Sequence, residues 1–238
     1  MPSGDVMTPR QRFDPSLIPE KPDLTHEVVL WQQGLTLVAG VDEAGRGALA
    51  GPVAAGAVIL PFDQANVMNQ LNGVRDSKVM TASDREHWAG VIKTVAGAWA
   101  VGMAGTDEID RLGILPATYL AACRALANLG ITPDHVLVDY LTFPNANYPQ
   151  TPLVKGDARS LSIAAAAILA KTARDAVLVE LDQVFPGYGF AQNKGYGTLS
   201  HRQALKTLGP CSQHRRTFAP VSDFDSLFPP EVEENTKT

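Results

Sequence analysis

Two adjacent acidic residues, Asp42 and Glu43, follow the apolar residues 38–41 and precede a loop that contains glycine and one arginine. Neighbouring carboxylates repel each other and lose hydration beside apolar residues, so a bound cation is the usual compensation. Oxygen ligands of this kind suit Mg²⁺ or Mn²⁺. The loop Gly45-Arg46-Gly47 offers unhindered backbone N–H groups and a guanidinium, which can hold a phosphate or a sugar hydroxyl. The segment therefore predicts a metal site beside such a loop, with an acidic β-hairpin turn as the alternative.

Two further acids stand at positions from which they could reach the same site. Asp139 ends the apolar run 135–140, so it repeats the pattern of Asp42, and functional groups gather at the carboxyl ends of strands in α/β sheets. If these two strands are parallel neighbours, roughly 5 Å apart, their acids can share a cation. Asp157 precedes a predicted helix that begins at Ser160, where helix capping is an equally good interpretation. Acids from three elements would allow two metals about 3.5–4 Å apart, as in-line phosphoryl displacement requires.

The elements that must position these acids form an α/β pattern with a mixed sheet. The apolar runs predict strands over residues 35–42, 51–60, 97–105, 135–140 and 152–155. Capping residues predict a helix that begins at Thr81 or Ser83, with Glu86 three residues after Ser83 as in a capping box. Further helices are predicted over residues 117–129, 160–181 and 198–208, and Pro116 stands at the start of the first of these three.

Composition bounds the class of protein. The chain has 238 residues, 45% of them hydrophobic and 19% charged, which is typical of a globular protein with a sizeable core. No apolar run approaches the roughly 20 residues that span a bilayer, and the N-terminal residues lack the pattern of a signal peptide. Cys123 and Cys211 are too few for a disulfide framework and lack metal-ligand spacing. We therefore expect a cytoplasmic protein with no membrane contact.

The net charge of −5 is unevenly distributed. Five acids and three bases lie in residues 1–35, and five acids and one base in residues 223–238, which leaves 15 acids and 16 bases between them. Residues 183–222 contain no acid but hold Lys194, Arg202, Lys206, Arg215 and Arg216. Carboxylates for a metal and cations for a polyanionic backbone would fit this asymmetry, although basic residues can simply be solvated. We expect His201 and His214 to be surface or phosphate-side groups.

Five motifs carry a resemblance to a known family. They are GVDEAGRGALAGPV at 40–53, DSK at 76–78, VLVDY at 136–140, KGDARSLSIAAAAILAKTARD at 155–175 and NKGYGT at 193–198. In this order they resemble ribonuclease HII, the type 2 ribonuclease H family, over about residues 35–220. The resemblance implies an α/β ribonuclease H-like fold, with a mixed five-stranded sheet flanked by helices and a small C-terminal helical extension. It also implies metal-dependent hydrolysis of RNA in RNA–DNA hybrids and incision 5′ of ribonucleotides embedded in duplex DNA, leaving 3′-hydroxyl and 5′-phosphate ends.

By motif position, the resemblance also implies residue roles. The catalytic ligands of two Mg²⁺ or Mn²⁺ ions would be Asp42, Glu43, Asp139 and Asp157. The loop of Gly45, Arg46 and Gly47 would contact the ribonucleotide and read its 2′-hydroxyl, and Tyr196 would pack on the sugar across the RNA–DNA junction. Phosphates would be held by Lys78, Lys171 and Arg174. One departure is Tyr140, which stands where a glycine often follows the acid of the strand.

The predicted segments are a largely disordered extension over 1–34, a catalytic core over 35–182, a basic helical segment for substrate over 183–222 and an acidic tail over 223–238. Within the extension, the apolar patch 28–31 is a candidate for docking on the core. The expected partners are RNA–DNA hybrids and ribonucleotide-containing duplex DNA, bound by a monomer. The segment DSLFPP at 225–230 is a candidate contact for a sliding clamp. Two alternatives are a silent nucleic-acid-binding module, which should have lost at least one of the four acids, and a resolvase-like DNA nuclease, which the GRG loop and Tyr196 disfavour.

Overall fold

A mixed five-stranded sheet forms the centre of the molecule, as predicted. The computed structural model describes residues 13–140, 142–144 and 148–223, so the predicted clamp contact at 225–230 lies outside the described residues. The strands are β1 (Val38–Ala44), β2 (Val53–Ile59), β3 (Ala98–Ala104), β4 (His135–Asp139) and β5 (Gln150–Leu153), and they lie in the order β3-β2-β1-β4-β5. The pairs β1–β2 and β2–β3 are antiparallel, whereas β1–β4 and β4–β5 are parallel.

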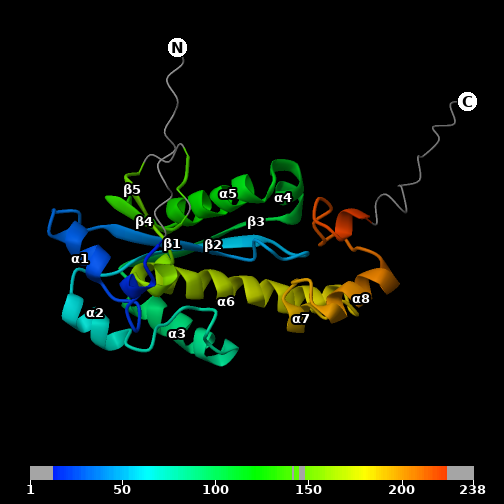
Figure 1. Ribbon diagram of the computed structural model, residues 1–238, viewed down its shortest axis with the longest axis horizontal. Coiled ribbons are helices and arrows are strands. Elements are labelled where there is room, and N and C mark those ends of the chain that lie inside the picture. Colours follow the sequence, from blue (N-terminus) through cyan, green and yellow to red (C-terminus); the bar gives the residue numbers. More distant parts are fainter. Residues whose placement is uncertain (1–12, 141, 145–147, 224–238) are drawn as a thin grey trace, which may run out of the picture.

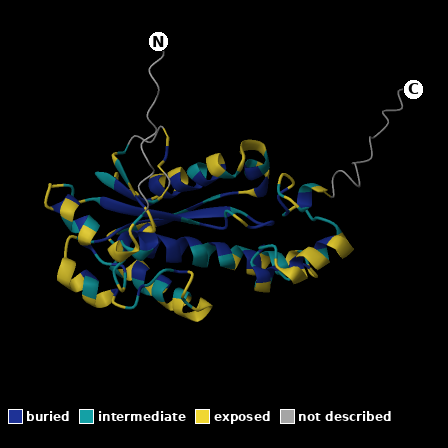
Figure 2. Ribbon diagram, in the orientation of Figure 1, coloured by how far each residue is buried: buried dark blue, intermediate teal, exposed yellow. Residues whose placement is uncertain are grey.

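Helices cover both faces of this sheet (Figure 1). They are α1 (Thr25–Trp31), α2 (Gln64–Gln70), α3 (Ala82–Val95), α4 (Thr106–Leu112), α5 (Ile114–Ala127), α6 (Leu161–Val184), α7 (Phe190–Asn193) and α8 (Leu199–Leu208), with short 3₁₀ turns η1 (Pro15–Leu17) and η2 (Gly156–Ala158). Helix α5 packs on one face and α6 on the other, with α3 outside α6. The sheet and the inner side of α6 are buried, and the outer helices are exposed (Figure 2). No helix in the described ranges is both long and apolar enough to cross a membrane.

Strand β1 extends beyond the predicted end of the strand. It pairs with β2 from Ala39 opposite Ile59 to Ala44 opposite Ala54, so Asp42 lies inside the strand rather than at its end. The backbone ladder carries the strand past the acids because the pairing with β2 continues up to the turn. Since side chains alternate along a strand, Asp42 and its neighbour Glu43 leave the sheet on opposite faces.

Other boundaries differ by a few residues. Helix α3 is capped by Thr81, whose hydroxyl accepts a hydrogen bond from the N–H of Asp84 (3.1 Å), so the predicted Ser83–Glu86 capping box is wrong. Helix α5 begins at Ile114, and Pro116 is tolerated there because first-turn N–H groups have no partner within the helix. Helix α6 continues to Val184, beyond the predicted domain boundary after residue 182.

The N-terminal part of the chain belongs to the core from about residue 24. Leu24 and Trp31 pack in the main apolar cluster, so residues 25–31 form a docked helix within the region predicted as a largely disordered extension. The carboxylate of Glu27 is buried and accepts hydrogen bonds from the hydroxyls of Ser160 (2.6 Å) and Ser162 (2.6 Å). These hydrogen bonds fix the position of the first residues of α6 and of the preceding turn, which carries the predicted ligand Asp157.

Two glycines in the sheet, which have no side chain, let α6 approach the sheet closely. A Cβ placed on Gly56 of β2 would lie 2.2 Å from the carbonyl oxygen of Ala166, which belongs to the helix backbone and cannot move aside. Gly40 of β1 likewise faces the backbone of Ser162, where an added Cβ would lie 2.2 Å from the carbonyl carbon. The small residues that the sequence places on α6 and the two strands therefore set the distance between these layers.

A matched pair of glycine substitutions tests this packing. Gly56→Ala should lower the free energy of unfolding by roughly 1–3 kcal/mol or more, because the new methyl group overlaps the helix backbone. Gly90→Ala, in the exposed part of α3 with nothing within 4 Å of the added Cβ, should raise it by about 0.5–1 kcal/mol. Urea unfolding followed by circular dichroism measures both, and equal effects from the two variants would contradict the close approach.

Candidate metal centre and substrate pocket

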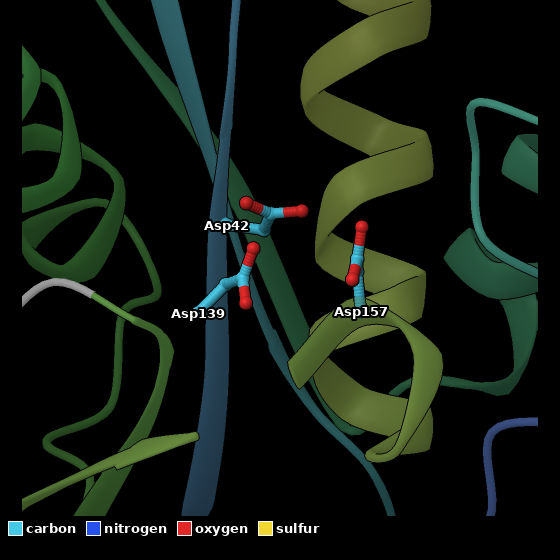
Figure 3. Close-up of side chains that lie close together, drawn as sticks. All are labelled: Asp42, Asp139 and Asp157. Atoms are coloured by element: carbon cyan, nitrogen blue, oxygen red, sulfur yellow. The ribbon is translucent and has the colours of Figure 1, made fainter. Parts of the chain in front are cut away.

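Three carboxylates from separate elements meet at one end of the sheet (Figure 3). Asp42 comes from β1, Asp139 from the end of β4 and Asp157 from η2, and one ligand oxygen from each lies within 4.8 Å of the others. The parallel register that pairs Val41 with Val138 brings the first two side by side. The turn before α6 supplies the third because α6 packs over β1.

Burial and mutual repulsion make this cluster unfavourable without a cation. Burial raises the pKa of Asp42 well above its usual value, and the negative charges of Glu43, Asp139 and Asp157 raise it further. Burial, followed by the charge of Asp157, raises the pKa of Asp139 to about 6. Few donors offset this: the N–H of Glu43 bonds to Asp42 (2.7 Å) and that of Gly156 to Asp139 (2.7 Å). Three converging oxygen ligands with excess negative charge fit a hard divalent cation such as Mg²⁺ or Mn²⁺.

Lys78 contacts this cluster through Asp157. Its ammonium lies 2.5 Å from Oδ2 of Asp157. Burial tends to lower the pKa of this ammonium, but the hydrogen bond and the charge of Asp157 outweigh it and raise the pKa above its usual value. Lys78 is therefore a fixed positive charge at the edge of the carboxylates, and its side chain is otherwise open to solvent.

The fourth predicted ligand, Glu43, lies outside the group of three. Its carboxylate accepts a hydrogen bond from the guanidinium of Arg46 at 3.0 Å. The alternation along β1 explains this separation, because neighbouring side chains of a strand point in opposite directions. Glu43 nevertheless lines an open pocket beside the cluster, together with Lys78, whose ammonium contacts Asp157.

An open pocket of about 340 Å³ adjoins the cluster and gathers most of the predicted substrate residues. Its lining includes Glu43, Gly45, Arg46, Gly47, Lys78, Lys171 and Tyr196. The ammonium of Lys171 lies 5.3 Å from the centre of the Tyr196 ring and 2.7 Å from a carboxylate oxygen of Asp175. Within the described part of the chain, the backbone N–H groups of Arg46 and Gly47 have no hydrogen-bond partner, so they can donate hydrogen bonds to a ligand.

The structure does not place Arg174 where it could contact a phosphate. Its side chain is fully buried, and its guanidinium donates to the carbonyl oxygens of Pro52 (2.8 Å), Lys194 (2.9 Å) and Ala50 (3.1 Å). The predicted phosphate contact is therefore wrong for this residue, which instead joins two loops. The carbonyls come from positions remote in the sequence, so no local pattern could have revealed the burial.

The two histidines predicted at the surface are also buried. His201 and His214 are 0% and 1% exposed, and their Nε2 atoms lie 3.0 Å apart. Next to them Arg215, which counted among the basic residues of the predicted substrate segment, is 0% exposed. The basic segment thus contains fewer surface cations than its composition suggests. The absence of acids from this stretch predicts cations for a polyanionic backbone, but backbone carbonyls bind the Arg215 guanidinium inside the protein.

Known proteins resemble this chain over most of its length. The family described as Ribonuclease HII matches residues 39–221. Ribonuclease HII from Moorella thermoacetica is 54% identical over 189 residues, which cover 79% of this chain and 89% of that protein. Ribonuclease HII from Anaeromyxobacter sp. (strain Fw109-5) is 52% identical over 206 residues, but this chain spans only 64% of its length. The crystal structure of ribonuclease H2 from Pyrococcus horikoshii OT3 has a TM-score of 0.66, is 27% identical and covers 80% of this chain and 98% of its own.

The raised carboxylate pKa values predict how a metal alters stability. An acid whose pKa is raised by folding destabilises the fold as pH rises through that pKa. Asp42→Asn should therefore raise the metal-free melting temperature at neutral pH by about 3–6 °C, corresponding to roughly 1–2 kcal/mol, and should lose most of the further rise that Mg²⁺ or Mn²⁺ gives the wild type.

Thermal melts at acidic and neutral pH, with and without metal, measure both effects. The difference between wild type and variant should shrink below about pH 4, where the carboxylates are protonated in both folded and unfolded states. The exposed Asp107→Asn on α4 serves as the control. A variant that keeps the full metal-induced rise would rule out Asp42 as a ligand.

Proposed function

The chain belongs to the ribonuclease HII family, and on that premise we propose that it is a metal-dependent endoribonuclease acting on RNA–DNA duplexes. It hydrolyses RNA in RNA–DNA hybrids and incises 5′ of ribonucleotides embedded in duplex DNA, leaving 3′-hydroxyl and 5′-phosphate ends. The observation that carries this proposal is the cluster of Asp42, Asp139 and Asp157 beside a pocket lined by a glycine loop and an aromatic ring.

The carboxylates of this proposal have distinct tasks. Asp42, Asp139 and Asp157 would hold Mg²⁺ or Mn²⁺, and Glu43 would complete the set from the pocket side. When two such ions are bound, they lower the pKa of an attacking water and neutralise charge on the leaving oxygen. Lys78, held beside the cluster by its ion pair, can contact a phosphate in the pocket with its exposed ammonium. Repulsion among the carboxylates favours cation binding over the empty site.

The pocket supplies groups that can tell RNA from DNA. The 2′-hydroxyl is the chemical difference at each nucleotide, and the free N–H groups of Arg46 and Gly47 are donors suited to it. The ring of Tyr196 would pack on the sugar of the following deoxynucleotide and so define the junction. Lys171, next to this ring, would pair with a neighbouring phosphate. We propose RNA–DNA hybrids and ribonucleotide-containing duplex DNA as the substrates of this surface.

Cleavage of end-labelled duplex DNA that carries one ribonucleotide tests the proposed function. With Mg²⁺ or Mn²⁺ the wild type should cut on the 5′ side of the ribonucleotide, and chelation of the metal should stop the reaction. Asp139→Asn should reduce the rate at least about a hundredfold, because a carboxylate that holds the metal is lost, whereas Asp107→Asn should have no effect. Cleavage within about tenfold of wild type by Asp139→Asn would refute the assignment of this ligand.

Gly47→Val separates substrate approach from folding. A Cβ at this position meets nothing within 4 Å, so the variant should keep the melting temperature of the wild type. The added methyl groups would occupy the space where a ribose approaches the loop N–H groups, so cleavage should fall about a hundredfold, or nearly 3 kcal/mol in transition-state stabilisation. Gly90→Val, on exposed α3, controls for the substitution itself. Wild-type rates in Gly47→Val would mean that the ribonucleotide binds elsewhere.

A further inference from the structure

Two consecutive residues, His214 and Arg215, lie buried behind the proposed ribonucleotide-reading surface. The segment that follows α8 returns to the turn between β1 and β2 (Figure 1). There the N–H of Arg215 donates to the carbonyl of Leu49 (2.9 Å), and the N–H of Gly51 donates to that of Gln213 (2.9 Å). Both side chains point into the protein, at 1% and 0% exposure. Neither side chain has a task in the proposed chemistry.

Arg215 holds the glycine loop by its carbonyl oxygens. Its guanidinium donates to the carbonyls of Gly45 (2.8 Å), Arg46 (2.9 Å), Gly51 (3.0 Å) and Pro52 (3.2 Å). No carboxylate takes part in these contacts. Backbone oxygens thus satisfy a buried cation, and in return the cation determines the direction in which those oxygens point.

This arrangement also determines the direction of the free N–H groups. In a planar trans peptide the N–H points opposite to the C=O of the same unit. The carbonyl of Gly45 shares its peptide with the N–H of Arg46, and the carbonyl of Arg46 shares its peptide with the N–H of Gly47. Because Arg215 binds both carbonyls on the inner side, both N–H groups face outward. These are the two N–H groups that have no partner among the described residues and lie at the pocket.

The protonation of the two buried histidines follows from one donor of known direction. The backbone N–H of Cys211 donates to Nδ1 of His214 at 3.0 Å, so that nitrogen carries no proton. The proton of a neutral His214 then lies on Nε2 and is donated to Nε2 of His201 at 3.0 Å. His201 therefore carries its proton on Nδ1, which donates to the backbone carbonyl of Tyr196 at 2.9 Å.

The surroundings keep both imidazoles neutral and in place. Burial, with a contribution from the neighbouring His201, lowers the pKa of His214 to about 4, and burial also lowers the pKa of His201. The ring of Phe190 packs against both, with centroid separations of 5.4 Å and 5.5 Å. Each ring thus has a single proton, and the hydrogen bonds run in one direction from Cys211 to the carbonyl of Tyr196.

We propose that His214 and Arg215 are positioning residues for the ribonucleotide-reading surface. Arg215 orients the N–H groups of Arg46 and Gly47, and His214, acting through His201, fixes the backbone of Tyr196. The inference rests on the proposed function, because it assigns these residues to the surface that reads the ribonucleotide. One buried dipeptide then holds the loop and the aromatic ring in a constant relation to each other.

Nitrogen NMR of the imidazole rings tests the hydrogen-bond chain without any substrate. At neutral pH the protein should show His201 protonated on Nδ1 and His214 protonated on Nε2. His214→Asn should shift the amide resonance of Gly197, whose N–H shares its peptide with the Tyr196 carbonyl, and Arg215→Lys should shift those of Arg46 and Gly47. Reversed or mixed tautomers, or unchanged amide resonances in both variants, would overturn the inference whether or not the enzyme cleaves ribonucleotides.

A comparison of two substitutions at His214 tests its effect on cleavage. Asn can still accept from the N–H of Cys211 but is too short to reach His201, whereas the amide N–H₂ of Gln can take the place of Nε2. His214→Asn should lower kcat/KM about tenfold on the single-ribonucleotide duplex, the loss expected for one hydrogen bond, and less than threefold on a continuous RNA–DNA hybrid. His214→Gln should recover most of the loss, and exposed His87→Asn on α3 is the control. Equal losses on both substrates would contradict positioning of Tyr196.

Arg215→Lys tests the loop in the same assays. A lysine ammonium cannot bind four carbonyls at once, so cleavage of both substrates should fall at least about tenfold. The metal-induced rise in melting temperature should stay as in wild type, because the carboxylates are untouched, and exposed Arg111→Lys on α4 is the control. Loss of the metal effect as well would indicate general unfolding and overturn the positioning role. If the wild type itself cleaves neither substrate, the proposed function fails while the NMR result still decides the inference.

Discussion

Repulsion among three clustered carboxylates, two buried and one half-buried, is the constraint on which the rest of the structure depends. Asp42, Asp139 and Asp157 would separate if their backbones were free to move, since like charges repel and since burial and like charge raise the pKa values of Asp42 and Asp139. The fold prevents this because the three acids belong to rigid elements. Two of these are neighbouring parallel strands, and the third is a turn tied to the first residues of α6. The same repulsion favours occupation of the site by a divalent cation.

Helix α6 connects the carboxylate cluster to the sheet and to the loops of the pocket. Its N-terminus is pinned by the buried Glu27 through two serines, and its middle packs on strands whose glycines leave room for the helix backbone. The far part of α6 carries Arg174, which bonds to the carbonyls of two loops at the pocket. One helix therefore sets the place of the third carboxylate and supports the loops beside it.

Two buried guanidinium groups hold the loops that surround the pocket. Arg174 and Arg215 have backbone carbonyls as partners, so they organise loops rather than attract a polyanion. Desolvating a guanidinium is costly unless its donors are satisfied, and several loop carbonyls meet that need together. The surface cations left for nucleic acid at the pocket include Arg46, Lys78 and Lys171, and each of these three is already paired with a carboxylate.

The sequence alone determined the class of fold, the strands with their acids and the family, because these depend on local patterns and on motifs whose spacing is read directly. It also predicted that Asp42 and Asp139 would meet, since both mark the ends of apolar runs. The tertiary structure decided what depends on contacts remote along the chain. Pairing with β2 carried β1 past Asp42, and alternation separated Glu43 from the cluster. Arg174, His201 and Arg215 became internal because their partners are backbone carbonyls or a ring distant in sequence, and no local pattern records where such a partner will lie.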